Sequence, residues 1–312
     1  MQLLSAYLAS HMLFEGRYEI VSELGSGGFG SVYKARDTLC ANDLVAIKEV
    51  CLQGLTAREL MDATNSFQRE AELLSQLTHP SLPRLQEQIL LPEQWYLVMD
   101  YIEGVTLDDY QKKLPNKRLP LSEVFTIGQQ LCNVLEYLHT RQPPVVFRDL
   151  KPTNIIRAPD GKVYLIDFGI ARFFKPGQVK DTIALGSLGY AAPEQYGKIQ
   201  TTPRADIYAL GAVLHQMLTG NDPSENPLRL ARLRGKHATS DSDPSSLTGS
   251  MVGILMESLG KLIDSMLEMD SNKRPTSVTL VKTELHNLAS SWSEIVADFV
   301  RPRYPRPSPQ RT

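Results

Sequence analysis

The chain has 312 residues, 42% of them hydrophobic, and a formal net charge of −2 at pH 7. A chain of this size can bury a full core as two moderate units or as one large two-lobed domain, and its composition argues against wholesale disorder. The near-neutral charge argues against a general nucleic-acid-binding protein. Cys40, Cys51 and Cys132 form no CxxC pair, which predicts a reducing compartment and no structural zinc site.

The N-terminal stretch, residues 1–14, is fairly apolar but has no basic start and no small-residue cleavage site. We therefore expect residues 1–17 to be an extension, frayed or weakly amphipathic, rather than a targeting sequence. No apolar run reaches the roughly 18 residues that a transmembrane helix needs. These observations predict a cytoplasmic protein with no membrane segment in this chain.

Short β-like runs follow over residues 18–100, for example Tyr18–Val21, Ser31–Lys34 and Val45–Lys48. One strong helix interrupts them. Its apolar residues recur at spacings of four, three and three, so they share one face: Phe67, Ala71, Leu74 and Leu77.

Helical periodicity dominates from about Gly104 onward. Ser122 is the predicted N-cap of a helix. The apolar stripe of this helix is formed by Val124, Ile127, Leu131, Leu135 and Leu138. Residues 235–250, crowded with Ser, Thr, Asp and Pro, are expected to form a surface loop. The last residues, 301–312, are rich in Pro and Arg and predict an extended tail.

A glycine-rich segment, Leu24–Val32, contains the pattern G-x-G-x-x-G with Gly25, Gly27 and Gly30. The same glycines open dinucleotide-binding folds, where a helix follows them. Here an alternating strand pattern follows Gly30, so a strand–loop–strand hairpin is favoured. Its backbone N–H groups can approach phosphate oxygens without obstruction by Cβ atoms. An ordinary glycine-rich hairpin remains the alternative for this motif taken alone.

Lys48 ends the apolar run Val45–Lys48 and lies on a predicted strand. A lysine in such surroundings is costly unless a carboxylate or a phosphate pairs with it. Glu70 is the expected partner, because it follows Phe67 by three residues and projects from the inward side of the predicted helix.

Three later motifs resemble those of protein kinases, specifically the bacterial serine/threonine kinases of eukaryotic type. Phe147–Asn154 is similar to the catalytic loop, Asp167–Gly169 to the magnesium motif, and Ala192–Glu194 to the end of the activation segment. The resemblance implies an α+β, two-lobed fold: a small antiparallel β-sheet lobe with one helix over residues 18–100, and a hinge and larger, mainly helical lobe over 101–288. Residues 289–312 would be the end of the last helix and the tail.

The resemblance also implies an ATP- and Mg²⁺-dependent protein serine/threonine kinase. Asp149 would orient the acceptor hydroxyl and accept its proton, with Lys151 beside the transferring phosphoryl group. Asn154 and Asp167 supply hard oxygen ligands suited to Mg²⁺. Lys48, held by Glu70, would bind the α- and β-phosphates of ATP. The expected ATP-binding residues are Leu24, Gly25, Gly27, Gly30, Val32, Ala46, Lys48, Met99 (the gatekeeper), Asp100, Ile102 and Ile156, with Ile166 just before Asp167.

Other positions carry regulatory or structural expectations from the same resemblance. Ser187 stands where the family usually has threonine and keeps the hydroxyl that could bridge Asp149 and Lys151. Thr182 is the first candidate for a regulatory phosphate, which Arg148 could bind, and Ser187 is the second candidate. The expected structural residues are Arg148, Asp206, which would brace the catalytic loop, and the buried pair Glu194 and Arg274.

One departure is Phe147, which replaces the usual histidine before Arg148 and keeps apolar packing but not polar contacts. The resemblance leaves two rival functions: a pseudokinase that only binds, and a small-molecule kinase on a related fold. The presence of Lys48, Asp149 and Asp167 argues against the first, and Ala192–Glu194 argues against the second. The expected partners are ATP and protein substrates. Self-association for trans-autophosphorylation, and a sensor or membrane domain beyond the tail, stay open.

Overall fold

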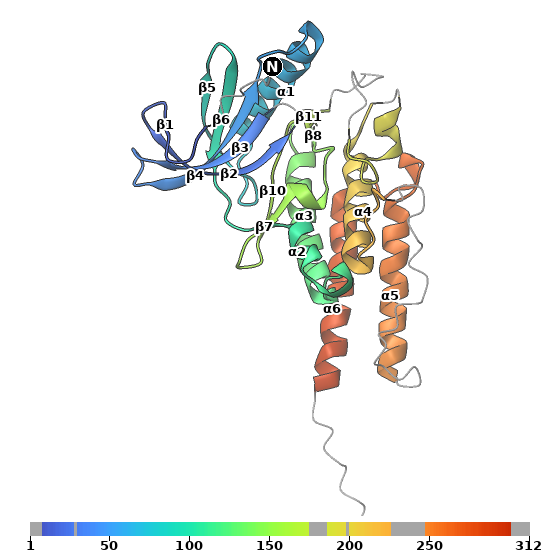
Figure 1. Ribbon diagram of the computed structural model, residues 1–312. Helices are drawn as coiled ribbons and strands as arrows, with labels where there is room; N and C mark the ends of the chain where they lie inside the picture. Colours follow the sequence, from blue (N-terminus) through green and yellow to red (C-terminus); the bar gives the residue numbers. More distant parts are fainter. Residues whose placement is uncertain (1–7, 28–29, 175–185, 198–199, 226–246, 301–312) are drawn as a thin grey trace, which may run out of the picture.

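The computed structural model describes residues 8–27, 30–174, 186–197, 200–225 and 247–300. It has two lobes, a sheet with one long helix and a larger helical lobe below it (Figure 1). The predicted two-lobed fold is therefore confirmed.

The N-terminal lobe is built on one antiparallel sheet in the order β1-β2-β3-β4-β6-β5. Its strands are β1 (Leu13–Phe14), β2 (Tyr18–Gly27), β3 (Gly30–Asp37), β4 (Asp43–Cys51), β5 (Leu85–Leu90) and β6 (Gln94–Asp100). β2 and β3 form the predicted hairpin, with Gly27 opposite Gly30. A Cβ atom on Gly30 would lie 2.0 Å from the Glu49 carbonyl oxygen, so glycine is required at the start of β3, where it lies against the backbone of β4.

The extension before Tyr18 is not frayed over its described part. Leu13 and Phe14 form β1 and pair with β2, and the side chains of Leu8 and Phe14 are buried on the sheet with Tyr18 and Tyr96. These apolar side chains thus cover one face of the sheet. Of the two alternatives expected for this extension, frayed or weakly amphipathic, the first is wrong from residue 8 onward.

Helix α1 (Ala57–Gln76) covers the other face of the sheet. Thr56 caps it through a capping box: Glu59 N–H donates to Thr56 Oγ1 at 3.3 Å, and Thr56 N–H donates to Glu59 Oε2 at 2.9 Å. Phe67, Ala71 and Leu74 are buried on its inward face, as their spacing predicts.

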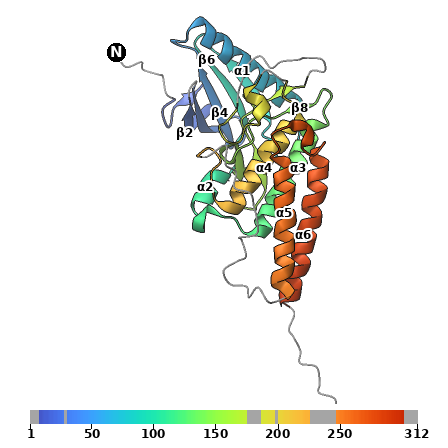
Figure 2. The same cartoon turned by 90° about the vertical axis from the view of Figure 1, so that its right-hand side faces the viewer.

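The C-terminal lobe contains α2 (Leu107–Lys112), α3 (Leu121–His139), α4 (Pro203–Thr219), α5 (Leu247–Met266) and α6 (Val278–Val300), with 3₁₀ turns at Pro115–Lys117, Pro152–Asn154, Pro193–Tyr196 and Ser271–Lys273. Two small sheets complete it, from β7 (Val105–Thr106), β8 (Val145–Val146), β9 (Ile155–Arg157), β10 (Val163–Leu165) and β11 (Arg172–Phe173). Helices α5 and α6 lie side by side (Figure 2).

Helix α3 supplies much of the core of this lobe. All five residues of its predicted stripe are buried. The predicted N-cap at Ser122 is wrong, because the helix begins at Leu121 and Pro120 occupies the capping position without a side-chain hydrogen bond. Proline suits a helix start because its fixed φ matches the entering backbone and its missing N–H is not needed there.

Helix α4 runs through the centre of the lobe and is buried on nearly all sides. Gly211 lets α5 approach it, since a Cβ atom there would lie 2.9 Å from the Met266 Cβ. Residues 247–250, expected in a surface loop, belong to α5; residues 226–246 lie outside the described part. Among the described helices, none combines the length and hydropathy that a membrane-spanning segment requires.

Candidate active site

A cavity of about 450 Å³ lies between the two lobes. Strands β2, β3 and β4 supply apolar side chains on one side, including Val32 and Ala46, and β9 supplies Ile156 on the other. Predicted residues that line it are Leu24, Gly25, Val32, Ala46, Lys48, Glu70, Met99, Asp100, Ile102, Asn154, Ile156, Ile166 and Asp167. A slot with two apolar faces suits a flat aromatic ring such as a purine.

Several lining residues were not predicted. They are Pro83, Gly104, Val105, Thr106, Asp109 and Thr153, whereas Tyr101, which also lines the cavity, lies within the predicted hinge. Gly104 lies next to the predicted hinge, so chain position could have indicated it. Nothing in the sequence indicated that Thr106 and Asp109 would line a cavity, because their types and spacing are those of a helix cap. They do cap α2, where Thr106 Oγ1 donates to Asp109 Oδ2 at 2.8 Å. The predicted residue Gly30 is not among the residues that line the cavity. Glycine is needed there because the backbone of Glu49 on β4 leaves no room for a Cβ atom.

Lys48 joins the two lobes through two carboxylates. Its Nζ lies 2.7 Å from Glu70 Oε2 on α1 and 2.9 Å from Asp167 Oδ1. Burial acts to lower the pKa of Lys48, but Glu70 and Asp167 outweigh it and raise that pKa above its usual value. Burial likewise acts to raise the pKa of Asp167, yet Lys48 holds that pKa below its usual value. The cavity therefore presents an ammonium group and a carboxylate side by side.

Asp149 lies in a compact polar cluster beside this cavity. Ser187 Oγ donates to Asp149 Oδ1 at 2.7 Å, and Lys151 Nζ lies 2.9 Å from Asp149 Oδ2 and 2.6 Å from Ser187 Oγ. Asn154 Nδ2 donates to Asp149 Oδ2 at 2.8 Å. The bridge predicted for Ser187 is present. One carboxylate is thus oriented by three donors from two separate segments.

Asp206 on α4 holds the backbone before Asp149. Its carboxylate accepts hydrogen bonds from the N–H groups of Phe147 at 2.8 Å and Arg148 at 2.7 Å. His139 Nε2 lies 2.8 Å from the same carboxylate. The backbone at Arg148 is left-handed, with φ of 71°, a conformation that needs such support in a residue with a side chain. His139 was not predicted, because nothing in the sequence near it marks this contact.

Phe147 is fully buried and packs edge-on against Phe168, with ring centroids 5.0 Å apart and an interplanar angle of 77°. Edge-to-face pairs of this kind are favourable beyond their buried area. The apolar packing expected of Phe147 is therefore present, and its partner is the central residue of Asp167–Gly169.

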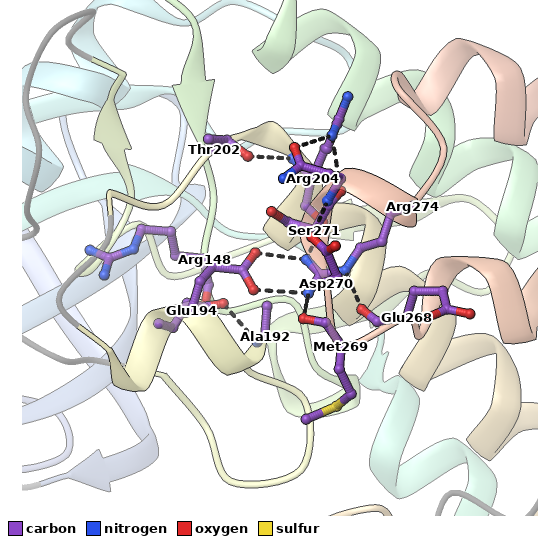
Figure 3. Close-up of polar contacts among 12 residues, drawn as sticks. Arg148, Ala192, Glu194, Thr202, Arg204, Glu268, Met269, Asp270, Ser271 and Arg274 are labelled. Atoms are coloured by element: carbon purple, nitrogen blue, oxygen red, sulfur yellow. Dashed lines mark hydrogen bonds and ion pairs between the residues drawn. The ribbon is translucent and has the colours of Figure 1, made fainter.

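Glu194 and Arg274 form the predicted ion pair, and Figure 3 shows Arg274 reaching Glu194 with two guanidinium nitrogens. The distances are 2.7 and 2.8 Å, and the Arg274 side chain is fully buried. Gln195, which was not predicted, donates from Nε2 to the Arg148 carbonyl oxygen at 2.9 Å. This segment is thereby tied to the catalytic-loop motif. Thr182 lies outside the described residues.

The protein kinase domain family matches residues 18–286 of the chain. The chain belongs to this family. Curated relatives include a probable serine/threonine-protein kinase PknB of Lactococcus lactis (33% identical over 220 residues, 70% of this chain and 34% of the relative) and the serine/threonine-protein kinase PrkC of Bacillus subtilis (32% over 251 residues, 79% and 38%). Another is serine/threonine-protein kinase D of Synechocystis (33% over 294 residues, 89% and 53%).

The expected resemblance to bacterial serine/threonine kinases of eukaryotic type is confirmed by these relatives. The matched part of this protein kinase chain spans only about a third to a half of their length.

Proposed function

We propose that this chain is an active protein serine/threonine kinase, which transfers the γ-phosphoryl group of Mg-ATP to hydroxyl groups of protein substrates, itself included, in bacterial signalling. The observation that carries the proposal is the cluster around Asp149, set beside a cavity that holds the Lys48–Glu70–Asp167 contacts. Catalysis of phosphoryl transfer consists mainly of alignment and charge neutralisation, and these side chains suit both.

The nucleotide would lie in the cavity between the lobes. Its adenine ring fits between Val32 and Ala46 on one side and Ile156 on the other, and its phosphates reach Lys48. Asn154 and Asp167 line the same cavity and would hold Mg²⁺. The low pKa of Asp167 fits this role, because a carboxylate is a preferred ligand of this ion. Bound there, Mg²⁺ would neutralise charge on the phosphate oxygens.

Asp149 would orient the acceptor hydroxyl and take its proton as the oxygen attacks. Ser187 donates to Oδ1, and Asn154 and Lys151 both contact Oδ2, so Oδ1 keeps one lone pair for the substrate hydroxyl. Lys151 places its ammonium group 2.9 Å from this carboxylate, where it would stabilise charge that develops on the transferring group. A serine or threonine acceptor is supported by Lys151 and by the names of the relatives.

The purified chain should transfer label from γ-labelled ATP to serine and threonine of a generic basic protein. Removing Mg²⁺ with EDTA should stop the transfer, because the phosphate charge would lose its counterion. The labelled product is subjected to phosphoamino-acid analysis, and ATP binding by the chain is measured in parallel. Bound ATP without transfer would favour the pseudokinase alternative, and transfer to an aminoglycoside but not to protein would favour the small-molecule kinase.

Thr182 remains the proposed site of a regulatory phosphate. Burial lowers the pKa of Arg148 to about 10; the charge of Asp206 opposes this shift and that of Arg69 adds to it. Burial also lowers the pKa of Arg172 to about 10, with further lowering by Arg148 and Arg69. Three arginines that repel one another would gain from a dianionic phosphate between them. After incubation with Mg-ATP, mass spectrometry should find phosphate on Thr182, and Thr182→Ala should lower the transfer rate. Full activity in an unphosphorylated protein would contradict this role.

A further inference from the structure

Glu49 on β4 is a buried carboxyl group that the proposed phosphate transfer does not use. It follows Lys48, and because side chains alternate along a strand, it points to the opposite face of the sheet, away from the nucleotide cavity. Only 3% of this residue is exposed. Within the described part of the chain its polar partners are tyrosine hydroxyls, and no cation pairs with it. Burial without a counterion favours the neutral form of such a group.

Two tyrosine hydroxyls hold this carboxyl group. Tyr33 Oη on β3 lies 3.1 Å from Glu49 Oε2. Tyr96 Oη on β6 lies 3.1 Å from Glu49 Oε1 and also 3.1 Å from Gln94 Oε1, yet it has one hydrogen for these two oxygens. If Glu49 carries a proton, it donates to Tyr96 and Tyr96 donates to Gln94, so every contact is a hydrogen bond. With the amide oriented in this way, the geometry fits the neutral acid better than the carboxylate.

None of the titratable groups that face Glu49 in the described part of the chain brings a positive charge. They are Tyr33 on β3, Tyr96 on β6 and Glu23 on β2, with Cys51 next on the same face of β4. Burial raises the pKa of Glu49, the two tyrosine hydrogen bonds act to lower it, and the charge of Glu23 raises it further. The net change is a rise, because burial is the largest of these effects.

The basic side chains closest along the chain to the covering segment are directed elsewhere. His11 is an exposed side chain that lies 3.8 Å from Glu19. Arg17, between β1 and β2, binds both oxygens of Asp37, from Nε at 2.8 Å and from Nη2 at 2.6 Å. Neither of them is a counterion of Glu49.

Residues 8–14 cover the two tyrosines that hold this carboxyl group. Phe14 packs on the ring of Tyr96, with centroids 4.5 Å apart, and a backbone hydrogen bond joins Leu8 to the Tyr33 hydroxyl. All four side chains belong to one buried apolar cluster. Because the segment rests on the hydrogen-bond partners of the carboxyl group, solvating a charge there would require the segment to move.

We propose that Glu49 is held as the neutral acid and acts as a pH-dependent latch for residues 8–14, which stay packed on the sheet while it keeps its proton and loosen when it releases that proton to solvent. The ionised group would be a charge in an apolar cluster, and water drawn to it would displace the segment. Because the pKa of Glu49 is raised, the packing has its full stability below the usual glutamate pKa and loses it as the pH rises through the raised value. In that window the ratio of packed to loosened protein falls by at most about tenfold per pH unit, since one proton is involved.

Hydrogen exchange of the backbone amides of residues 8–14 measures this packing in the full chain. The unaltered protein is compared with Glu49→Gln at each pH between about 5 and 9, so the pH dependence of intrinsic exchange cancels. Glutamine has the shape of the neutral acid and can still donate to Tyr96 and accept from Tyr33. Exchange should be similar in the two proteins at low pH and faster in the unaltered protein as the pH rises, by up to about tenfold per pH unit. Glu72→Gln is the matched control, because Glu72 is exposed on α1, and it should behave as the unaltered protein.

Infrared spectroscopy follows the proton itself. The unaltered protein should show the C=O band of a protonated carboxylic acid that is missing in Glu49→Gln, and this band should disappear over the same pH range in which exchange becomes faster. Equal exchange in the two proteins at every pH would overturn the proposal. The absence of a protonated band assigned to Glu49 would overturn it as well, because the carboxylate would then be stable under the packed segment.

Tyr96→Phe provides a second test that leaves Glu49 in place, in case Glu49→Gln does not fold. It removes a hydrogen bond that favours the ionised form, so the loosening of residues 8–14 should move to higher pH. An unchanged transition, or one at lower pH, would contradict the latch. None of these measurements requires phosphate transfer, so their outcome is independent of the proposed function.

Discussion

Asp149→Asn should lower the rate of phosphate transfer by about a thousandfold, the range expected when a positioned general base is lost. The amide has nearly the same shape as the carboxylate, so Ser187 can still donate to its oxygen. What disappears is the ability to accept the proton of the attacking hydroxyl. The amide NH₂ group would also face Lys151 or Asn154, which are donors themselves. The measurement is single-turnover transfer from γ-labelled ATP to a saturating protein acceptor.

ATP binding should change little in this variant, because the described residues that line the nucleotide cavity do not include Asp149. Asp160→Asn is the matched control: Asp160 is exposed in a turn, where it accepts from Lys162 N–H, and its replacement should leave the rate unchanged. A rate within about tenfold of the unaltered protein would contradict the assignment of Asp149 as general base.

Arg274→Ala should lower the free energy of unfolding by roughly 3–5 kcal/mol, the usual result when one member of a buried ion pair is removed. Glu194 would keep its charge next to the space that the missing arginine side chain leaves in the protein interior. The backbone carbonyl oxygens of Glu268 and Arg204, to which the guanidinium donates at 2.8 and 3.0 Å, would lose their donor as well. The cation–π contact with Tyr208, at 4.9 Å, would also be lost.

Urea unfolding followed by circular dichroism measures this change. Lys261→Ala removes one member of an exposed pair on α5 and should leave the midpoint nearly unaltered, since solvent and salt screen that pair. Equal, small effects in the two variants would show that the Glu194–Arg274 pair does not hold the activation-segment motif in place.

Much of the site was predictable because its residues belong to short sequence motifs with characteristic spacing. Lys48 belongs to an apolar strand run, and Glu70 to the inward side of an amphipathic helix, so their pairing follows from burial alone. Asp149, Lys151 and Asn154 lie within six residues, where spacing already implies proximity. The contacts of His139 with Asp206 and of Gln195 with the Arg148 carbonyl oxygen join segments 67 and 47 residues apart and leave no such local signal.

The errors have the same origin. Ser122 is a good capping residue by type, but the helix already begins at Leu121, with Pro120 at the capping position. The polar composition before Leu247 suggested a loop up to residue 250, whereas α5 begins at Leu247. A frayed extension was one of the two alternatives predicted for residues 8–14, but Leu8 and Phe14 pack on an apolar face of the sheet.

The sequence by itself determined the family, the order of the two lobes and the identity of the polar groups at the proposed reaction centre, because each depends on residue type at close spacing. Tertiary structure alone decided which distant side chains orient those groups, and that a second cavity with Gln111 at its wall adjoins them. Hydrogen bonds and fields act over a few ångströms of space, and the fold sets those distances between residues that lie far apart along the chain.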